Sequence, residues 1–326
     1  MCEQEFLVGK KVLITGITGL IGRGLAYILS KNNEVHGAAR FSNPKIEKEL
    51  SSICHKLYKL DLSKKESVES LPKDYDVVFN LAVHWGEYRG PLEKDWNTFI
   101  KTMEVNSFLP ARLILHFKDT QAKLVFGSTG SLYTPSKNRK DLHVEGKTCW
   151  EGGECIYEDT KMGGDILIYW ISQDFKVPAI ILRYYWPEAP YTGGGRIGYI
   201  VRSFLKGQSI KASRVNPWWH NLGYISDIVY ATIAAANFVA IPAPIYNVSG
   251  EEITNTYEKA LVVAEELGIE PKIEEVEDEG PSMYLADVSK MKRDLWKPQI
   301  GLKECVRRVV KAIKEEINTP QDWMFE

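Results

Sequence analysis

The chain has no excess of basic charge, no long apolar run and no basic leader. Its formal net charge is −2, whereas proteins that bind nucleic acid or anionic membranes carry a basic excess. No apolar run approaches the ~20 residues that cross a bilayer. Acids follow Met1 closely, where a signal peptide would carry bases. We therefore expect a cytoplasmic protein that acts on a small molecule and binds neither nucleic acid nor membrane.

Cysteine and histidine are also scarce. The five cysteines are odd in number and scattered, which is typical of reduced thiols and not of a disulfide framework. The six histidines form neither an H-E-x-x-H motif nor a Cys/His pairing, so we expect no metal site. The 326 residues, 44% of them hydrophobic, suffice for one large domain or two modest ones.

Three glycines stand between an apolar run and a predicted helix near the start of the chain. The run Lys11–Thr15 is short enough for one buried strand, and Leu20–Leu29 has the pattern of a helix. Glycine lets the backbone approach phosphates, and free N–H groups at a helix N-terminus attract negative charge. Tight strand-to-helix turns also use glycine without any ligand. We predict a dinucleotide pyrophosphate site formed by Gly16, Thr18, Gly19, Leu20, Ile21 and Gly22.

The end of the second predicted strand, residues 34–40, indicates which dinucleotide is bound. The adenosine ribose lies at this strand end in a dinucleotide fold, and NAD binding uses an acidic residue there. This chain has Ala39 and then Arg40. A guanidinium pairs well with a phosphate, so Arg40 favours NADP over NAD. The alternative is that Arg40 is a solvated side chain at a strand end.

Two further strands contribute candidate cofactor contacts. Residues 55–60 form a third apolar strand that ends at Asp61 and Leu62. The Asp61 carboxylate could accept a hydrogen bond from the adenine amino group, or it could cap the helix that starts near residue 63. Residues 76–82 are the fourth strand, with Leu81 and Ala82 at its end.

Strands and helices continue to alternate up to residue 183. The predicted elements are a helix over 96–117, a strand over 122–126, a helix over 157–173 and a strand over 178–183. A helix over 226–239 and a strand over 244–248 later restore the pattern. This alternation predicts an α/β fold with a Rossmann-type doubly wound parallel sheet.

The pattern changes from Tyr184 onward. The glycine run 193–195 and the pair Trp218 and Trp219 interrupt the alternation. We predict an NAD(P)-binding domain over 1–183, to which 225–250 returns, and a smaller interleaved substrate-binding region over 184–326. The acidic run over 274–279 is interpreted as a solvated loop.

Tyr157 and Lys161 are four residues apart, so on a helix they share one face. An ammonium beside a phenol favours the phenolate and lowers the phenol pKa from about 10. The tyrosine can then exchange a proton with a substrate oxygen while hydride moves. Thr129 follows the fifth strand, where open α/β sheets bind ligands, and can hold the same oxygen. Alone, such a pair can equally be an ordinary helix-surface pair.

Taken in order, these segments resemble the extended short-chain dehydrogenase/reductases, the group of NAD(P)-dependent sugar epimerases and dehydratases. Gly16, Gly19 and Gly22 match the cofactor turn of this family, and Tyr157 with Lys161 matches its catalytic pair. Other matching segments are Asp61-Leu62, Asn80-Leu81-Ala82, Asn106, the run 128–133, Leu182-Arg183-Tyr184-Tyr185 and the runs 224–227, 246–248 and 287–290. The resemblance covers nearly the whole chain.

This resemblance implies a catalytic set of Thr129, Tyr157 and Lys161 together with Asn106, in which Lys161 also holds the nicotinamide ribose. It implies a homodimer packed through the helices over 96–117 and 157–173. Further cofactor contacts are implied for Asp61, Leu62, Leu81, Ala82, Tyr157 and Tyr184.

Three departures from the family pattern bear on the substrate. Trp186 stands where the nucleotide-sugar enzymes usually have an asparagine, and His220 where they usually have an arginine for the diphosphate. Gly130 and Ser131 replace an Asp-Glu pair of the dehydratases, which argues against dehydration. Loss of an arginine fork weakens diphosphate recognition, and aromatic lining suits a less charged ligand. Candidate substrate contacts are His84, Trp85, Ser131, Trp186, Trp219 and His220, although His84 and each tryptophan could equally be packed core residues.

Our leading hypothesis is an NADP-dependent oxidoreductase that interconverts a carbonyl and an alcohol on a small, partly apolar substrate. The alternative is a nucleotide-sugar epimerase with tightly bound NAD, in which Arg89, Arg196 or Arg202 anchors the diphosphate. An enone reductase and a non-catalytic dinucleotide sensor are the remaining alternatives. The regular Tyr157 and Lys161 pair argues against both.

Overall fold

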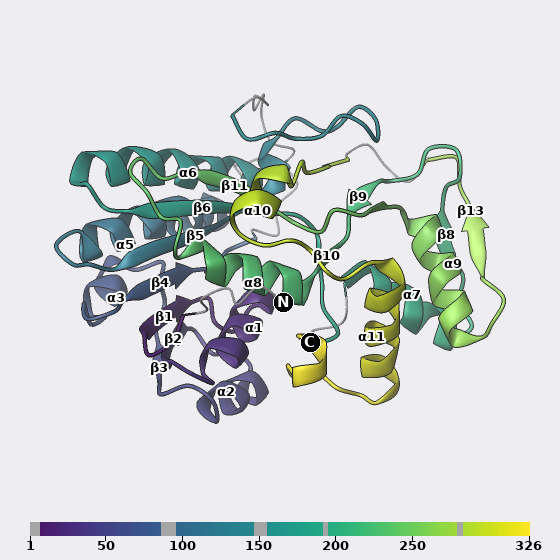
Figure 1. Ribbon diagram of the computed structural model, residues 1–326, viewed down its shortest axis with the longest axis horizontal. Coiled ribbons are helices and arrows are strands. Elements are labelled where there is room, and N and C mark those ends of the chain that lie inside the picture. Colours follow the sequence, from purple (N-terminus) through teal and green to yellow (C-terminus); the bar gives the residue numbers. More distant parts are fainter. Residues whose placement is uncertain (1–6, 86–95, 147–154, 192–194, 279–282) are drawn as a thin grey trace. The chain divides into compact units, whose positions relative to one another are not determined.

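Seven parallel strands form the central sheet, and helices flank it (Figure 1). In spatial order the strands are β11 (Ile245–Val248), β6 (Ala179–Tyr184), β5 (Lys123–Thr129), β4 (Val77–Asn80), β1 (Lys11–Thr15), β2 (Glu34–Ala39) and β3 (Lys56–Lys59). The strand order reverses between β1 and β4, and open α/β sheets bind ligands at the carboxyl edge of such a reversal. The Rossmann-type fold predicted from the alternation is confirmed.

The helices around the sheet alternate with its strands. They are α1 (Leu20–Leu29), α2 (Pro44–Ser51), α3 (Lys65–Glu69), α4 (Trp96–Met103), α5 (Leu109–Phe117), α6 (Ile156–Phe175) and α8 (Ile225–Ala235). Between α4 and α5 the helix predicted over 96–117 passes through a π-helical segment, η2 (Glu104–Phe108). One core cluster joins buried residues of α3, α5 and α6 to alternate residues of the strands, such as Leu13 and Val78. These three helices therefore cover one face of the sheet (Figure 1).

The structure is a computed structural model that describes residues 7–85, 96–146, 155–191, 195–278 and 283–326. The chain divides into two compact units. The first unit comprises residues 1–134, 150–183 and 231–246, and the second comprises 135–149, 184–230 and 247–326. Each unit is thus assembled from three separate stretches of the chain.

Three helices that pack on one another form the second unit: α7 (Gly195–Leu205), α9 (Thr256–Leu267) and α11 (Leu302–Lys314). The ends of α9 follow from its flanking residues. The Asn255 side chain accepts the Glu258 N–H at 2.8 Å, and Gly268 ends the helix with φ +67°. Its strands form the pairs β7 (Pro187–Glu188) with β10 (Gly223–Tyr224), β9 (His220–Asn221) with β12 (Ile253–Thr254) and β8 (Ile210–Ala212) with β13 (Ile273–Glu275). Helix α10 (Ser289–Asp294) and the short helical turn η4 (Asp322–Met324) also belong to it.

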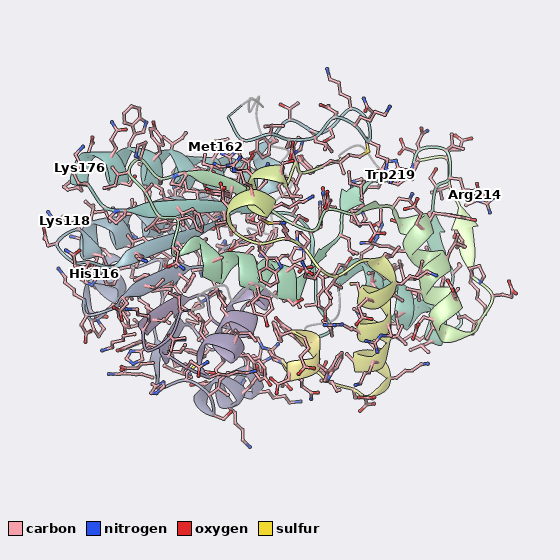
Figure 2. All side chains as sticks on the ribbon, in the orientation of Figure 1. His116, Lys118, Met162, Lys176, Arg214 and Trp219 are labelled. Carbon is pink, nitrogen blue, oxygen red and sulfur yellow. The ribbon has the colours of Figure 1, made fainter. Side chains whose placement is uncertain are left out.

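The interpretation of the acidic run 274–279 as a solvated loop is wrong for its first two residues. They belong to β13, which pairs in parallel with β8. Side-chain charge does not prevent this pairing, because the main chain forms the ladder and the carboxylates stay in solvent. Glu274 lies 3.6 Å from Lys211, and Glu275 lies 3.6 Å from Arg214. Figure 2 labels Arg214.

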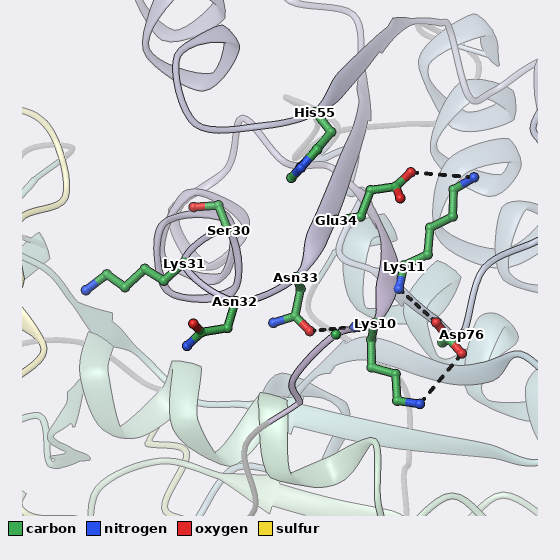
Figure 3. A pocket seen from close by; sticks show the side chains of 10 residues that line it. Lys10, Lys11, Ser30, Lys31, Asn32, Asn33, Glu34, His55 and Asp76 are labelled. Carbon is green, nitrogen blue, oxygen red and sulfur yellow. Dashed lines mark hydrogen bonds and ion pairs between the residues drawn. The ribbon is translucent and has the colours of Figure 1, made fainter.

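A hollow of about 480 Å³ lies at the amino-terminal edge of the sheet (Figure 3). Two of the lysines that line it form ion pairs with acids that also line it. Lys11 Nζ lies 3.6 Å from Glu34, and Lys10 Nζ lies 3.9 Å from Asp76. Such exposed pairs contribute little to stability. This edge is opposite to the carboxyl edge on which the strand reversal places a ligand site.

Among the residues that the structure describes, no helix is long and apolar enough to cross a membrane. The same residues include no group of three His, Cys, Asp or Glu side chains able to hold a metal ion.

Candidate active site

The turn from β1 into α1 leaves no room for a side chain at Gly16 or at Gly22. Gly16 has a φ of +68°, and a Cβ on it would lie 2.5 Å from the Ala82 nitrogen. A Cβ on Gly22 would lie 2.6 Å from the Gly16 carbonyl oxygen. The N-cap residue of α1 is Gly19, which offers no side-chain cap. Backbone that can be approached this closely at a helix N-terminus fits a pyrophosphate group.

The predicted cofactor contacts that flank this turn lie at the carboxyl edge of the sheet. Thr18, Leu20 and Ile21 are half-buried around the start of α1. Leu81 and Ala82 directly follow β4, and the close approach of Ala82 to Gly16 places them beside the turn. Tyr184 is the last residue of β6 and the first residue of the second unit.

Arg40 and Asp61 follow the neighbouring strands β2 and β3. Arg40 is exposed, and no carboxylate of the described ranges lies within ion-pair distance of it. Asp61 accepts hydrogen bonds from the Ser63 N–H at 3.1 Å and the Ser63 hydroxyl at 2.8 Å. Burial opposes ionisation of Asp61, but these bonds and the charges of Lys101 and Arg40 lower its pKa. Asp61 thus stabilises a turn. It does not cap α3, because Lys64 occupies the N-cap position of that helix. Leu62, the residue after Asp61, is buried.

Thr129, Tyr157 and Lys161 come together at the carboxyl end of β5. Thr129 is the last residue of β5, and Tyr157 and Lys161 lie in the first two turns of α6. The Thr129 hydroxyl hydrogen-bonds the Tyr157 phenol and lies 2.9 Å from the Ser131 hydroxyl. Lys161 Nζ donates to the Gly127 carbonyl at 2.9 Å. The predicted catalytic residues therefore form one cluster in the first unit.

The electrostatics of the cluster differ from the expectation in one respect. Burial raises the pKa of Tyr157, and the hydrogen bond with Thr129 opposes this rise. Burial lowers the pKa of Lys161 to about 8, while the charge of Asp165 raises it. The predicted lowering of the Tyr157 pKa is therefore absent in the protein alone, because loss of water around the phenol outweighs it.

Asn106 lies in the π-helical segment and is buried. Its side chain accepts the His84 N–H at 3.0 Å and donates to the His84 carbonyl at 2.9 Å. It also donates to the Thr160 hydroxyl at 3.0 Å. Asn106 therefore ties the segment after β4 to α6, between Tyr157 and Lys161. π-Helical insertions often occur at functional sites.

The segment after β4 also brings an aromatic ring onto the catalytic tyrosine. The indole of Trp85 stacks on the Tyr157 ring, with centroids 4.3 Å apart and planes at 20°. Trp85 itself is 66% exposed. His84 is half-buried, and its Nδ1 lies 3.0 Å from the Thr102 hydroxyl. Of the alternatives for Trp85, a packed core residue is thus wrong.

Trp186, Trp218 and Trp219 belong to the second unit. Trp186 has a left-handed φ of +34°, which is uncommon for a bulky residue, and is 43% exposed. Its ring meets Trp218 edge-on with centroids 4.9 Å apart. The Arg139 guanidinium lies 4.3 Å from the centre of the Trp219 ring, at the position labelled in Figure 2. A half-exposed aromatic surface results.

His220 is buried in a charged network of the second unit. Lys259 Nζ lies 2.5 Å from His220 Nε2 and 2.8 Å from the Glu188 carboxylate. The His220 Nδ1 lies 3.2 Å from the Trp218 carbonyl. Burial and the charge of Lys259 lower the pKa of His220 well below its ordinary value. His220 is thus a neutral imidazole and offers no cationic fork. Lys259 and Glu188 were not predicted from the sequence as part of this network. Helix α9, which carries Lys259, is not among the predicted elements, and no local pattern indicates the ion pair between Lys259 and Glu188.

The three arginines proposed as a diphosphate anchor lie in different surroundings. Arg89 lies outside the described residues. Arg196 donates to the Thr256 hydroxyl at 3.3 Å, and its guanidinium lies 5.6 Å from the centre of the Trp218 ring. Arg202 is half-buried near the end of α7. Arg196 therefore adjoins the aromatic surface of the second unit.

Comparison with known proteins places this geometry in context. The sequence matches the model of the NAD dependent epimerase/dehydratase family over residues 12–249. The fold is similar to UDP-glucuronic acid 4-epimerase from Bacillus cereus, solved with UDP-glucuronic acid and NAD, with a TM-score of 0.77 and 21% identity over 94% of this chain and 99% of that one.

Two further solved structures show the same fold. UDP-N-acetylglucosamine 4-epimerase from Methanobrevibacter ruminantium, in complex with UDP-N-acetylmuramic acid, has a TM-score of 0.78 and 19% identity over 95% of this chain and 100% of that one. ADP-L-glycero-D-manno-heptose-6-epimerase from Helicobacter pylori has a TM-score of 0.78 and 20% identity over 94% and 96%. A search of curated proteins finds no match.

Proposed function

The chain belongs to the NAD dependent epimerase/dehydratase family, and on this premise we propose that it transfers hydride at a carbinol carbon of a nucleotide sugar and thereby epimerises it. A bound nicotinamide dinucleotide would supply the hydride acceptor and donor. Gly16, Gly19 and Gly22 would hold its pyrophosphate, and Lys161 would donate to its nicotinamide ribose. The single observation that carries the proposal is the convergence of Thr129, Tyr157 and Lys161 at the carboxyl end of β5.

The protein groups have separate tasks in this reaction. Tyr157 takes the proton from the substrate hydroxyl when the carbon is oxidised and returns it when the carbonyl is reduced. The Thr129 hydroxyl donates to the same substrate oxygen. The charge of Lys161 offsets the cost of a buried phenolate. Asn106 positions α6 and does not itself touch the reacting atoms.

Epimerisation is favoured because the three solved structures described above are all epimerases of nucleotide sugars. It requires an anchor for a diphosphate. Neutral His220 does not provide one. Ser131, which lies beside Thr129, and Trp85, which stacks on Tyr157, are proposed to line the sugar, since an indole face packs on the apolar face of a ring.

A second candidate function is the NADP-dependent interconversion of a carbonyl and an alcohol on a smaller, less charged substrate. Two observations favour it. Arg40 is exposed at the end of β2 without a carboxylate partner in the described ranges, as a 2′-phosphate site requires. His220 is neutral where an arginine fork would bind a diphosphate.

We also propose that the protein is a homodimer that packs through α4, α5 and α6. Eight large hydrophobic side chains on these helices and η2 are exposed: Trp96, Ile100, Phe108, Leu115, Ile166, Tyr169, Trp170 and Phe175. A large exposed apolar patch marks an interaction surface, and we propose that these side chains form one. Sedimentation of the wild type as a dimer and of Trp170→Lys as a monomer would support the interface, whereas a wild-type monomer at micromolar concentration would refute it.

The two candidate functions are separated by one experiment on the purified protein. Native mass spectrometry with added NAD and NADP identifies the retained dinucleotide. UDP-glucose, UDP-glucuronic acid and UDP-N-acetylglucosamine are then offered, and the products are resolved by NMR. Retained NAD with formation of a 4-epimer supports the epimerase. Exchangeable NADP without any epimer supports the reductase.

A further inference from the structure

A buried acid follows the catalytic pair on α6. Tyr157, Lys161 and Asp165 stand at four-residue intervals, so they lie on the same face of the helix. Their exposed fractions are 7%, 6% and 5%. A carboxylate is rarely this buried without a specific partner. Proton exchange at Tyr157 does not by itself require an acid at this position.

Arg183 of β6 is the partner of Asp165. Its Nε and Nη2 both lie 3.0 Å from Asp165 Oδ2. The guanidinium also lies 4.7 Å from the centre of the Tyr133 ring. Tyr133 directly follows the short helical turn η3 (Gly130–Leu132), which Thr129 begins. The pair Asp165 and Arg183 therefore connects α6, β6 and the segment that carries Thr129.

The charges of this group depend on one another. Burial lowers the pKa of Lys161 to about 8, and Asp165 is the group that raises it. Burial raises the pKa of Asp165, and the charge of Arg183 opposes this rise. The elements packed around Lys161 carry further titratable or charged groups. These are Tyr157, Glu158, Asp159, Tyr169 and Asp174 on α6, Lys123 on β5 and Tyr133 after it, Lys101 on α4, Glu104 on η2, and Arg112 and His116 on α5.

We propose that Asp165, fixed by Arg183, is a positioning residue whose negative charge, on the same buried helix face, keeps the Lys161 ammonium protonated. The inference rests on the proposed function of the Tyr157 and Lys161 pair. A merely structural ion pair would stabilise the packing of α6 against β6 without acting on Lys161. The proposal instead requires that Lys161 loses its proton more easily when the carboxylate is removed.

The test is a direct titration of Lys161. Protein labelled with ¹³C at lysine Cε is titrated by NMR, and the Lys161 signal is assigned by its absence in Lys161→Arg. In the wild type we expect a midpoint near pH 8. In Asp165→Asn, which keeps the shape of the side chain, we expect the midpoint to fall by ~1 pH unit or more. An unchanged midpoint in a folded Asp165→Asn protein would overturn the proposal.

Two variants guard the interpretation. Glu188→Gln removes a buried carboxylate of the second unit that is paired with Lys259, and it should leave the Lys161 midpoint at the wild-type value. If Asp165→Asn does not fold because Arg183 is left unpaired, the double variant Asp165→Asn, Arg183→Leu removes both charges. A lowered Lys161 midpoint in the double variant supports the proposal, and the wild-type midpoint overturns it.

An activity measurement distinguishes failure of this inference from failure of the proposed function. If the wild type catalyses epimerisation or reduction, the alkaline limb of its pH–rate profile should move to lower pH in Asp165→Asn and stay in place in Glu188→Gln. If no wild-type hydride transfer is found but the Lys161 midpoint shifts, the proposed function fails and the role of Asp165 stands. If activity is found and neither the midpoint nor the limb moves, the role of Asp165 fails.

Discussion

Two buried lysines, one in each unit, hold their charges in opposite ways. Lys259 of α9 is fully buried and lies between the Glu188 carboxylate, at 2.8 Å, and the His220 imidazole, at 2.5 Å. Lys161 of α6 is nearly as buried, but within the described ranges its hydrogen-bond acceptor is the Gly127 carbonyl and no carboxylate lies within ion-pair distance.

This difference between the two lysines indicates that Lys161 lowers the stability of the fold and serves the reaction instead. Lys259 pairs with Glu188 and His220 in a buried network, which we call closed because each charge in it has a partner. These contacts account for a buried lysine at this position. Lys161 keeps N–H groups for a partner that the protein does not supply, such as the ribose hydroxyls of a dinucleotide. A buried cation without a close counter-charge costs free energy. Such costs concentrate at functional sites.

The largest effect that we expect comes from replacing Lys161, the lysine without a close carboxylate. Lys161→Met should lower hydride transfer by about 10²–10³-fold, because the charge that favours the phenolate is lost. The same variant should gain about 1–3 kcal/mol of unfolding free energy at pH 7, since a buried charge is replaced by an apolar side chain. Urea unfolding and a single-turnover assay measure the two effects. Lower stability of the variant would contradict this account of Lys161.

The matching change in the second unit should have the opposite effect on stability. Lys259→Met leaves the buried Glu188 carboxylate without its cation, so we expect a loss of about 3–5 kcal/mol in unfolding free energy. The double variant Lys259→Met, Glu188→Leu should recover part of that loss, because neither charge remains. Urea unfolding of the wild type, the two single variants and the double variant measures the coupling energy between Lys259 and Glu188. Additive effects would show that the network is not closed.

The stability of the protein should also depend on pH through Lys161. The pKa of Lys161 falls from 10.5 to about 8 on folding, so between these values the unfolded chain binds a proton that the folded chain does not. The penalty of burying Lys161 is complete below pH 8 and disappears as the pH approaches 10.5. The stability advantage of Lys161→Met should shrink over that window in urea unfolding. A constant advantage from pH 7 to pH 10 would contradict the assignment.

The smallest effect that we expect concerns Arg40, an exposed cation that contacts neither Lys161 nor Lys259. Arg40→Ser should weaken NADP binding by about tenfold and leave NAD binding unchanged, because only NADP carries a 2′-phosphate. Isothermal titration calorimetry with both dinucleotides measures the ratio. Equal changes for NAD and NADP would show that Arg40 is a solvated side chain and has no role in cofactor choice.

The framework of the first unit was predictable because local patterns determine it. The apolar run before Gly16 predicts β1, and the glycine spacing predicts the turn into α1. The four-residue interval between Tyr157 and Lys161 places them on one helix face. In each case the information lies within a few residues of the feature, so tertiary contacts are not needed to read it.

The remaining features depend on contacts between distant residues. Nothing near Lys259 in the sequence shows that Glu188 and His220 lie beside it, so the burial of His220 could not be predicted. Asn106 lies in a π-helical segment and bonds to His84, 22 residues earlier in the chain, and neither feature has a local sequence signal. The raised pKa of Tyr157 reflects the degree of burial of its ring, which only the packed structure reveals.

The central claim is that Tyr157 exchanges the substrate proton while hydride moves to and from a bound dinucleotide. Its most direct test compares the wild type with Tyr157→Phe, measuring the dissociation constant of the dinucleotide and the rate of hydride transfer with the UDP-sugar panel. The account predicts that the dissociation constant is unchanged and that the rate falls by about 10²–10⁴-fold. A Tyr157→Phe protein that binds the dinucleotide normally and keeps most of its turnover would contradict it.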